Sequence, residues 1–223
     1  SGEEFVLPDG LIIKGVAALV AADGRTIQHW IRPRTDTATP LLTEALKKVF
    51  EDYTGKSELI APPAETDADL LSVYPIADQH NGMLSWGDET GEDYDIYIGV
   101  ERLRDCMKRL VAQSPKSKQA IILNLGDWQH TDDMKNMTPG HGNILDVDSR
   151  YFKILTAGIH LMQDCIELAL QKHETVLVRN IPGNHDLHAS IALTAALGAF
   201  YHNNPRVTID QTPGDWFFHR FGE

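Results

Sequence analysis

Cysteine is scarce in this sequence. Only Cys106 and Cys165 occur among 223 residues, which excludes the dense disulfide framework of a small secreted domain. Both cysteines lie in helix-like patterns that are far apart in the chain. We expect two buried free thiols in a reducing compartment, which favours a cytoplasmic protein over one with a single disulfide.

Long apolar runs are also missing. No stretch of about 18 consecutive apolar residues occurs, so we expect no membrane span. The first residues do not show a basic segment followed by an apolar segment, so we expect no signal peptide. Apolar residues make up 42% of the chain, which is ordinary for a protein that buries a core.

Basic residues are outnumbered by acidic ones. The 20 Lys and Arg stand against 32 Asp and Glu, which gives a net charge of -12. Proteins that bind duplex nucleic acid broadly use a basic face, so this composition argues against non-specific duplex binding by the chain alone. A local basic patch or bound metal ions can override net charge, so nucleic acid is not excluded as a partner.

The chain is long enough for one full domain and a small extension. Residues 1–65 are predicted to form the extension, and residues 66–223 the main domain. We interpret the extension as a packing element, with substrate positioning or partner docking as alternatives.

The extension is predicted to contain a β-hairpin and a helix. Residues 11–20 and 26–31 are β-prone and flank a turn, which is typical of a hairpin. Residues 40–53 show a helical apolar stripe, with Thr39 as the N-cap and Pro40 at the first helical position.

Three apolar runs in the main domain end at residues that bind metals. The runs are 71–77, 120–125 and 175–180, and helical patterns at 95–113 and 149–172 separate them. This alternation predicts parallel strands with crossover helices, which brings the strand ends together at one edge of a sheet. The polar residues that follow the runs are Asp78, His80, Asp127, His130, Asn184, His185 and Asp186.

The rest of the main domain completes the pattern. A helix is predicted at 189–201 and strands at 207–209 and 216–221. The acidic segment 86–95 lacks the full EF-hand spacing, so we interpret it as a solvated loop. Residues 131–147 form a long polar loop, which favours a functional or lid role.

The order D-x-H, G-D-x-x-H and G-N-H-D, each after a strand, resembles the calcineurin-like metallophosphoesterases. The motifs are Asp78–His80, Gly126–His130 and Gly183–Asp186. The form of the second motif is most similar to the DNA-repair exonuclease branch. The resemblance covers residues 72–188 and implies a mixed-sheet αββα sandwich with two divalent metal ions.

The resemblance also implies roles for single residues. It makes Asp78 and His80 ligands of the first metal, Asp127 the bridging ligand and Asn184 a ligand of the second metal. Two metals neutralise a phosphate ester and lower the pKa of a bound water. Mixed His, Asp and Asn ligands fit Mn²⁺ or iron, with Zn²⁺ as an alternative.

Three further residues are expected to act on the substrate or on each other. His185 is expected to protonate the leaving alkoxide, and Asp186 to orient its ring. His130 is expected either to contact the substrate phosphate or to lie at the surface. Trp128 is predicted to pack in the core, and His141 and His188 to be loop residues.

The sequence departs from the family after Asp186. The family continues with an isolated His and a G-H-x-H segment, whereas this chain offers only His188, His202 and His219. We expect incomplete metal shells and an incomplete second sheet, as in a fragment of a longer protein.

The resemblance implies a phosphodiesterase that uses a water activated by two metal ions, and the exonuclease-like second motif extends this expectation to a nuclease that acts on DNA. A phosphomonoesterase or nucleotide phosphatase on the same scaffold is the first alternative. A non-catalytic binding module with an incomplete metal site is the second. No pattern in the sequence specifies an oligomeric state.

Overall fold

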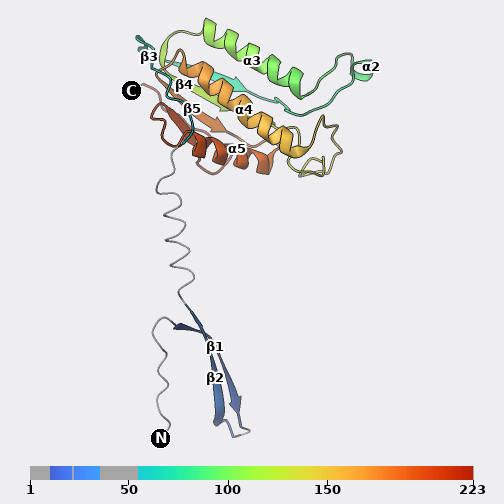
Figure 1. Cartoon of the computed structure of the whole chain (residues 1–223), viewed down its shortest axis with the longest axis vertical. Coiled ribbons are helices and arrows are strands. Elements are labelled where there is room, and N and C mark those ends of the chain that lie inside the picture. Colours follow the sequence, from blue (N-terminus) through green and yellow to red (C-terminus); the bar gives the residue numbers. More distant parts are fainter. Residues whose placement is uncertain (1–10, 22, 36–54, 223) are drawn as a thin grey trace. The chain divides into compact units, whose positions relative to one another are not determined.

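The computed structural model describes residues 11–21, 23–35 and 55–222. The chain divides into two compact units, Ser1–Thr54 and Gly55–Glu223 (Figure 1). The helix predicted at 40–53 lies outside the described residues. The assignment of residues 1–65 to a separate domain stays a prediction.

The smaller unit contains the expected hairpin. Strands β1 (Leu11–Val20) and β2 (Thr26–Thr35) pair antiparallel. At the turn, the N–H of Gly24 donates to the carbonyl of Ala21 over 2.9 Å, and Gly24 has a φ of 83°. The predicted hairpin is confirmed, and β2 continues past its predicted end at residue 31.

The larger unit is built on a four-stranded parallel sheet. Its strands are β3 (Asp67–Ile76), β4 (Ser117–Asn124), β5 (Thr175–Asn180) and β6 (Val207–Asp210), in the order β3-β4-β5-β6. These strands confirm the four predicted near 71–77, 120–125, 175–180 and 207–209. The sheet is parallel throughout, whereas a mixed sheet was predicted.

The register of this sheet aligns the strand ends. Ile76 pairs with Asn124, and Asn124 pairs with Asn180. Because these residues are the last of β3, β4 and β5, the three following loops leave the sheet at the same level. The metal-binding residue types that follow the strands therefore start from one edge.

Helices connect the strands where the sequence predicts them. They are α3 (Ile96–Gln113), α4 (Tyr151–Leu170) and α5 (Leu187–Phe200). The side chain of Asp95 caps α3 by accepting from the N–H of Ile98 over 2.8 Å. A short helix, α2 (Gly87–Thr90), interrupts the acidic segment that was predicted to be a loop.

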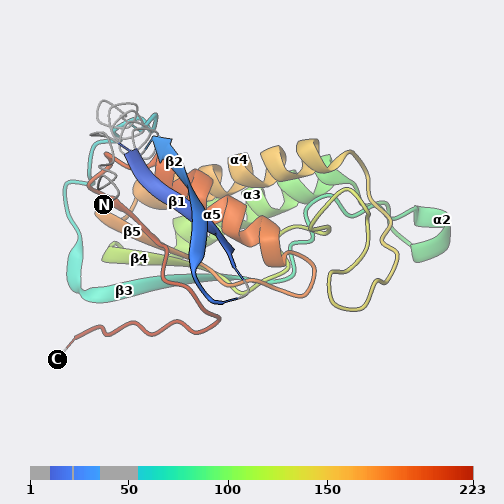
Figure 2. The same cartoon turned by 90° about the horizontal axis from the view of Figure 1, so that it is seen from below.

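The three long helices cover one face of the sheet (Figures 1 and 2). Alternate strand residues enter the same core as side chains from all three helices. From the strands these are Tyr74, Ile76, Ala120, Ile122, Val176 and Val178, and from the helices they include Met107, Leu161, Met162, Ile166, Leu193 and Leu197. The apolar stripes of the helices and the alternation along the strands thus bury a common set of residues.

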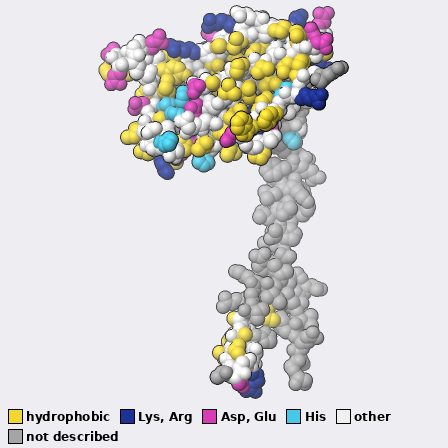
Figure 3. Space-filling view, turned by 180° about the vertical axis from the view of Figure 1, so that it is seen from behind, with side chains coloured by type: hydrophobic (Ala, Val, Ile, Leu, Met, Phe, Trp, Pro, Cys, Tyr) yellow, Lys and Arg dark blue, Asp and Glu magenta, His cyan; other side chains and the backbone are white. Residues whose placement is uncertain are grey.

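The opposite face of the sheet carries the C-terminal segment. Arg179 donates to the carbonyl oxygens of Thr212, Gly214 and Trp216, and His219 Nε2 lies 3.1 Å from Gln119 Oε1. The strand predicted at 216–221 is wrong, because within residues 55–222 no strand pairs with this segment. Figure 3 shows hydrophobic side chains gathered on the side of the larger unit that faces away from the viewer of Figure 1.

The two cysteines are both free thiols, as predicted. Cys165 is buried in the core, whereas Cys106 is exposed on α3, so the prediction that both are buried is wrong for Cys106. Among the described residues, no helix has the length and apolar character needed to cross a membrane.

Candidate metal centre

The loops after β3 and β4 run side by side beyond the sheet. The N–H of Asp78 donates to the carbonyl of Gly126 over 3.2 Å, and the N–H of His80 donates to the carbonyl of Asp127 over 2.8 Å. These bonds continue the parallel pairing of the two strands. They hold two residues of the first motif against the carboxylate of the second.

The backbone at this place is strained. Asp78, His80 and Asp127 have φ values of 53°, 46° and 52°. Residues other than glycine seldom adopt positive φ, and each such residue costs on the order of 1 kcal/mol or more. Such strain is typical of functional sites, where the surrounding structure enforces a geometry that the residue alone does not prefer.

The loop after β5 reaches the same carboxylate. The N–H of His185 donates to Oδ1 of Asp127 over 2.8 Å. A β-carbon at Gly183 would overlap with Oδ1 and with the backbone nitrogen of Asp127. The third motif therefore needs glycine at this position for its backbone to lie against the second motif.

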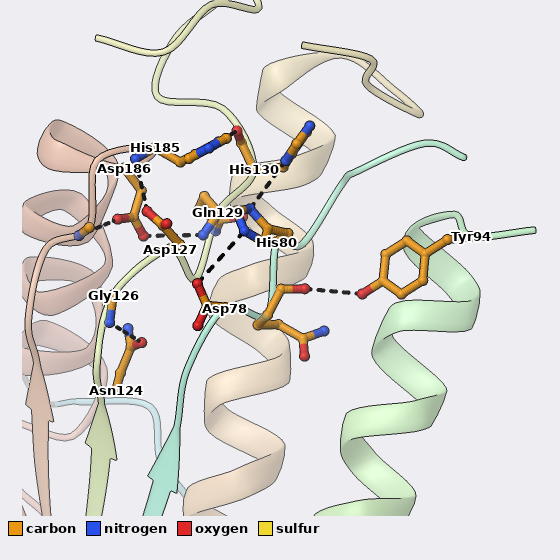
Figure 4. A network of polar contacts seen from close by, with 12 residues as sticks. Asp78, His80, Tyr94, Asn124, Gly126, Asp127, Gln129, His130, His185 and Asp186 are labelled. Carbon is orange, nitrogen blue, oxygen red and sulfur yellow. Dashed lines mark hydrogen bonds and ion pairs between the residues drawn. The ribbon is translucent and has the colours of Figure 1, made fainter. Parts of the chain in front are cut away.

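Five side chains from the three loops form two overlapping groups (Figure 4). Ligand atoms of Asp78, His80 and Asp127 all lie within 4.8 Å of one another, and those of His80, His130 and His185 do likewise. His80 belongs to both groups. Figure 3 shows histidine and acidic side chains beside one another at the surface of this unit.

Two histidines of this cluster, His80 and His130, favour the neutral form. Burial, together with the neighbouring His80 and His185, lowers the pKa of His130 to about 4. Burial and the nearby His185 also lower the pKa of His80. A neutral imidazole has a free lone pair for a metal ion, so the electrostatics of the site favour metal binding near neutral pH.

The tautomer of His185 follows from one hydrogen bond. Its Nδ1 lies 2.8 Å from the carbonyl oxygen of His130. A carbonyl only accepts hydrogen bonds, so Nδ1 carries the proton and Nε2 has the lone pair. A backbone carbonyl that orients an imidazole in this way is common behind metal-binding and catalytic histidines.

Asp186 has a different contact from the one predicted. Its carboxylate accepts from the N–H of Gly183 over 2.8 Å and from the N–H of Gln129 over 3.1 Å. The Nδ1 atom of His185 instead bonds the carbonyl of His130. Burial raises the pKa of Asp186. This carboxylate therefore ties two loops together through their backbones.

The other residues singled out in the sequence differ in how far they are buried. Asn184 is exposed at the loop between β5 and α5, and His141 is also exposed. His130 is buried within the cluster, so its surface alternative is wrong. Trp128 is fully buried, as predicted, and its Nε1 donates to the carbonyl of Gly158 over 3.1 Å.

Sequence reasoning missed the role of Asp132. This residue is buried, and it accepts from the N–H groups of His188 and Ala189 at the start of α5. The sequence places it only in a polar loop, two residues after His130. No local pattern predicts that its partners lie more than 50 residues further along the chain.

The donor set fits a divalent metal ion. Carboxylate oxygens and imidazole nitrogens are the mixed ligands that suit manganese, iron and zinc. The carbonyl of His130 orients the imidazole of His185 through a hydrogen bond. Gly183 has no side chain, which leaves room for the carboxylate of Asp127. The residues present therefore support metal binding at the carboxyl edge of the sheet.

Comparisons of this chain with protein-family models, with curated proteins and with solved structures find no match. The fold and the site rest on the chain's own geometry. That geometry is a parallel α/β sheet whose strand ends carry a His/Asp cluster that can bind metal.

Proposed function

We propose that this protein is a metal-dependent phosphoesterase that hydrolyses phosphodiester bonds. One observation carries the proposal. The loops after three adjacent parallel strands bring Asp78, His80, Asp127, His130 and His185 together. Each loop also contains one of the three motifs that resemble the calcineurin-like metallophosphoesterases, and the motifs occur in the family's order.

In this proposal, Asp127 is the central ligand. Its carboxylate lies between the loop of Asp78 and His80 and the loop of His185. That position suits a carboxylate shared by two ions, with Asn184 on the exposed side as a further oxygen ligand. When bound, the metal ions neutralise the phosphate and supply an activated water.

His185 is proposed as the proton donor. Its Nδ1 proton is engaged by the carbonyl of His130, so proton exchange takes place at Nε2. Protonation at Nε2 gives an imidazolium that delivers this proton to the leaving alkoxide. His130, whose side chain lies in the same cluster, is proposed to contact the phosphate.

Asp186 is proposed to act indirectly. Its buried carboxylate joins the backbone of Gly183 to that of Gln129 and so keeps the second and third motifs together. In this arrangement it supports the geometry of His185 and does not exchange protons with the substrate.

We also propose that the larger unit is part of an αββα sandwich, with a second sheet on the face that the helices leave uncovered. The helices cover one face of the parallel sheet, and residues such as Val73 remain 46% exposed on the other. A second sheet packed on that face would bury them. The two free thiols support a reducing, cytoplasmic location.

The test uses the protein freed of metal with a chelator and then titrated with Mn²⁺. We expect Mn²⁺ binding and Mn²⁺-dependent hydrolysis of bis-(p-nitrophenyl) phosphate, with slower turnover of the monoester p-nitrophenyl phosphate. Asp127→Ala is the control for contaminating enzymes, since its preparation must be inactive. DNA oligonucleotides then test the nuclease assignment.

Other outcomes distinguish the alternatives. Faster hydrolysis of the monoester would identify a phosphomonoesterase or nucleotide phosphatase. Mn²⁺ binding without turnover of either ester would identify a binding module. Failure to bind Mn²⁺, Fe²⁺ or Zn²⁺ would overturn the proposal.

A further inference from the structure

Helix α5 lacks a cap from the residue that precedes it. Asp186 occupies the N-cap position, and its side chain makes no capping hydrogen bond. Both of its carboxylate oxygens bond elsewhere, to the N–H groups of Gly183 and Gln129 (Figure 4). The first N–H groups of α5 therefore need another acceptor.

Asp132 supplies that acceptor from the loop after β4. Its Oδ1 accepts from the N–H of His188 over 2.8 Å and from the N–H of Ala189 over 2.7 Å. Its Oδ2 lies 2.5 Å from Nδ1 of His188. Asp132 is only 5% exposed, so its bonds to the backbone of α5 are shielded from water, whereas the ring of His188 is exposed.

The two carboxylates form a reciprocal clasp. Asp186 reaches from the third motif to the backbone of Gln129, and Asp132 reaches from the second motif to the backbone of α5. His130 lies between Gln129 and Asp132 in one segment, and His185 directly precedes Asp186 in the other, so the bond between His185 Nδ1 and the carbonyl of His130 lies beside the clasp. The clasp thus joins the two segments directly beside the contact of the His185 ring with His130.

We infer that Asp132 is a positioning residue of the metal centre. It caps α5 across the chain and thereby keeps Nδ1 of His185 bonded to the His130 carbonyl and the ring within the cluster. The effect of Asp132 on catalysis rests on the proposed function. The effect of Asp132 on the His185 ring does not, and it is tested without measuring turnover.

The experiment measures the tautomer of His185 in the metal-free protein by nitrogen-15 NMR, and Zn²⁺ binding by calorimetry. In the native protein we expect the Nδ1–H tautomer. In Asp132→Ala we expect a mixture of tautomers and Zn²⁺ affinity lower by about 10- to 100-fold, because the His185 ring belongs to one of the two groups that could hold a metal ion and would lose its fixed orientation.

Three variants separate positioning from stability. Asp132→Asn keeps an oxygen for the N–H groups of His188 and Ala189, so we expect it to restore the tautomer and most of the affinity. His188→Ala removes only the partner of Oδ2 and should resemble the native protein. Ile166→Val lowers stability to an extent similar to a lost cap, but it lies in the core and should leave both readouts unchanged.

The outcomes decide the inference. A native tautomer and native Zn²⁺ affinity in folded Asp132→Ala would overturn it and leave Asp132 as a structural cap only. Should Asp132→Ala not fold, Asp132→Ser, with one shorter acceptor, is expected to give intermediate changes, and native readouts there would also overturn it. Absence of Zn²⁺ binding in the native protein would count against the proposed function, while the tautomer would still test Asp132.

Discussion

The backbone N–H of His185 donates to Oδ1 of Asp127 across 2.8 Å, and this bond joins loops that follow two adjacent strands. It orients the Asp127 carboxylate beside Asp78 and His80. This carboxylate, which belongs to the second motif, therefore lies against residues of the first and third motifs. Most of the chemistry proposed here depends on that arrangement.

Asp127→Ala should abolish metal binding and metal-dependent turnover, because no neighbouring residue replaces a carboxylate shared by two ions. Calorimetric titration with Mn²⁺ measures the binding, and circular dichroism verifies the fold. The control is Asp133→Ala, which removes an exposed carboxylate nearby and should bind Mn²⁺ normally. Retained activity in Asp127→Ala would contradict the proposed mechanism.

Gly183→Ala should disrupt the site without removing a ligand. The added β-carbon would overlap with the backbone of Asp127, so the two loops must separate, at a cost of about 1–3 kcal/mol. Gly140→Ala is the matched control, because a β-carbon there meets nothing within 4 Å. Denaturant unfolding and Mn²⁺ titration should show losses in the first variant only. Equal behaviour of the two variants would show that the close approach is unimportant.

Protonation of His173 should weaken the fold in acid. His173 is fully buried between Tyr74 and Ser117, and burial lowers its pKa from about 6.5. Below pH 6.5 the unfolded chain takes up a proton that the native state resists. The stabilisation is therefore present above pH 6.5 and is lost as the pH falls toward the lowered native pKa.

The variant His173→Gln tests this pH dependence. Glutamine keeps polar contacts without titrating, so the decline in stability between about pH 7 and pH 5 should become shallower. His80 and His130 have lowered pKa values in both proteins and provide a common background. Urea unfolding at several pH values measures the slopes. Identical slopes would show that His173 does not contribute.

Arg206→Ala should destabilise the larger unit by about 2–4 kcal/mol, the range expected for losing several hydrogen bonds from a charged donor. The guanidinium donates to the carbonyls of Ile60, Leu170 and His173 over 2.5, 2.7 and 2.6 Å. Arg206→Lys should recover little, because an ammonium group lacks the planar fork. The exposed Arg109→Ala is the control, and thermal unfolding with proteolysis near residue 60 reports the loss. An unchanged melting temperature would contradict this role.

Local pattern was sufficient to predict most elements of the larger unit. The alternation of β-prone runs and helical stripes predicts β3, α3, β4, α4, β5, α5 and β6 close to their observed bounds. Local pattern failed at residues 216–221, where an apolar run has the composition of a strand. A strand also needs a partner, and the segment is held instead by single contacts such as those from Arg179.

The candidate ligands could also be named from the sequence, because their residue types follow three strands in order. Their contacts depend on long-range pairing. The positive φ of Asp127, the bond of His185 to the His130 carbonyl and the contacts of Asp186 all require loops from different strands to meet.

Asp132 shows most clearly where prediction from local sequence ends and tertiary structure decides. As a residue type in a polar loop it has no distinctive signal, and in space it caps a helix whose own N-cap residue bonds elsewhere. Residue identity and periodicity are local properties, so they predict elements and donor types. Hydrogen bonds between distant segments form only when the sheet aligns its strand ends, so the tertiary structure alone decides which groups face each other.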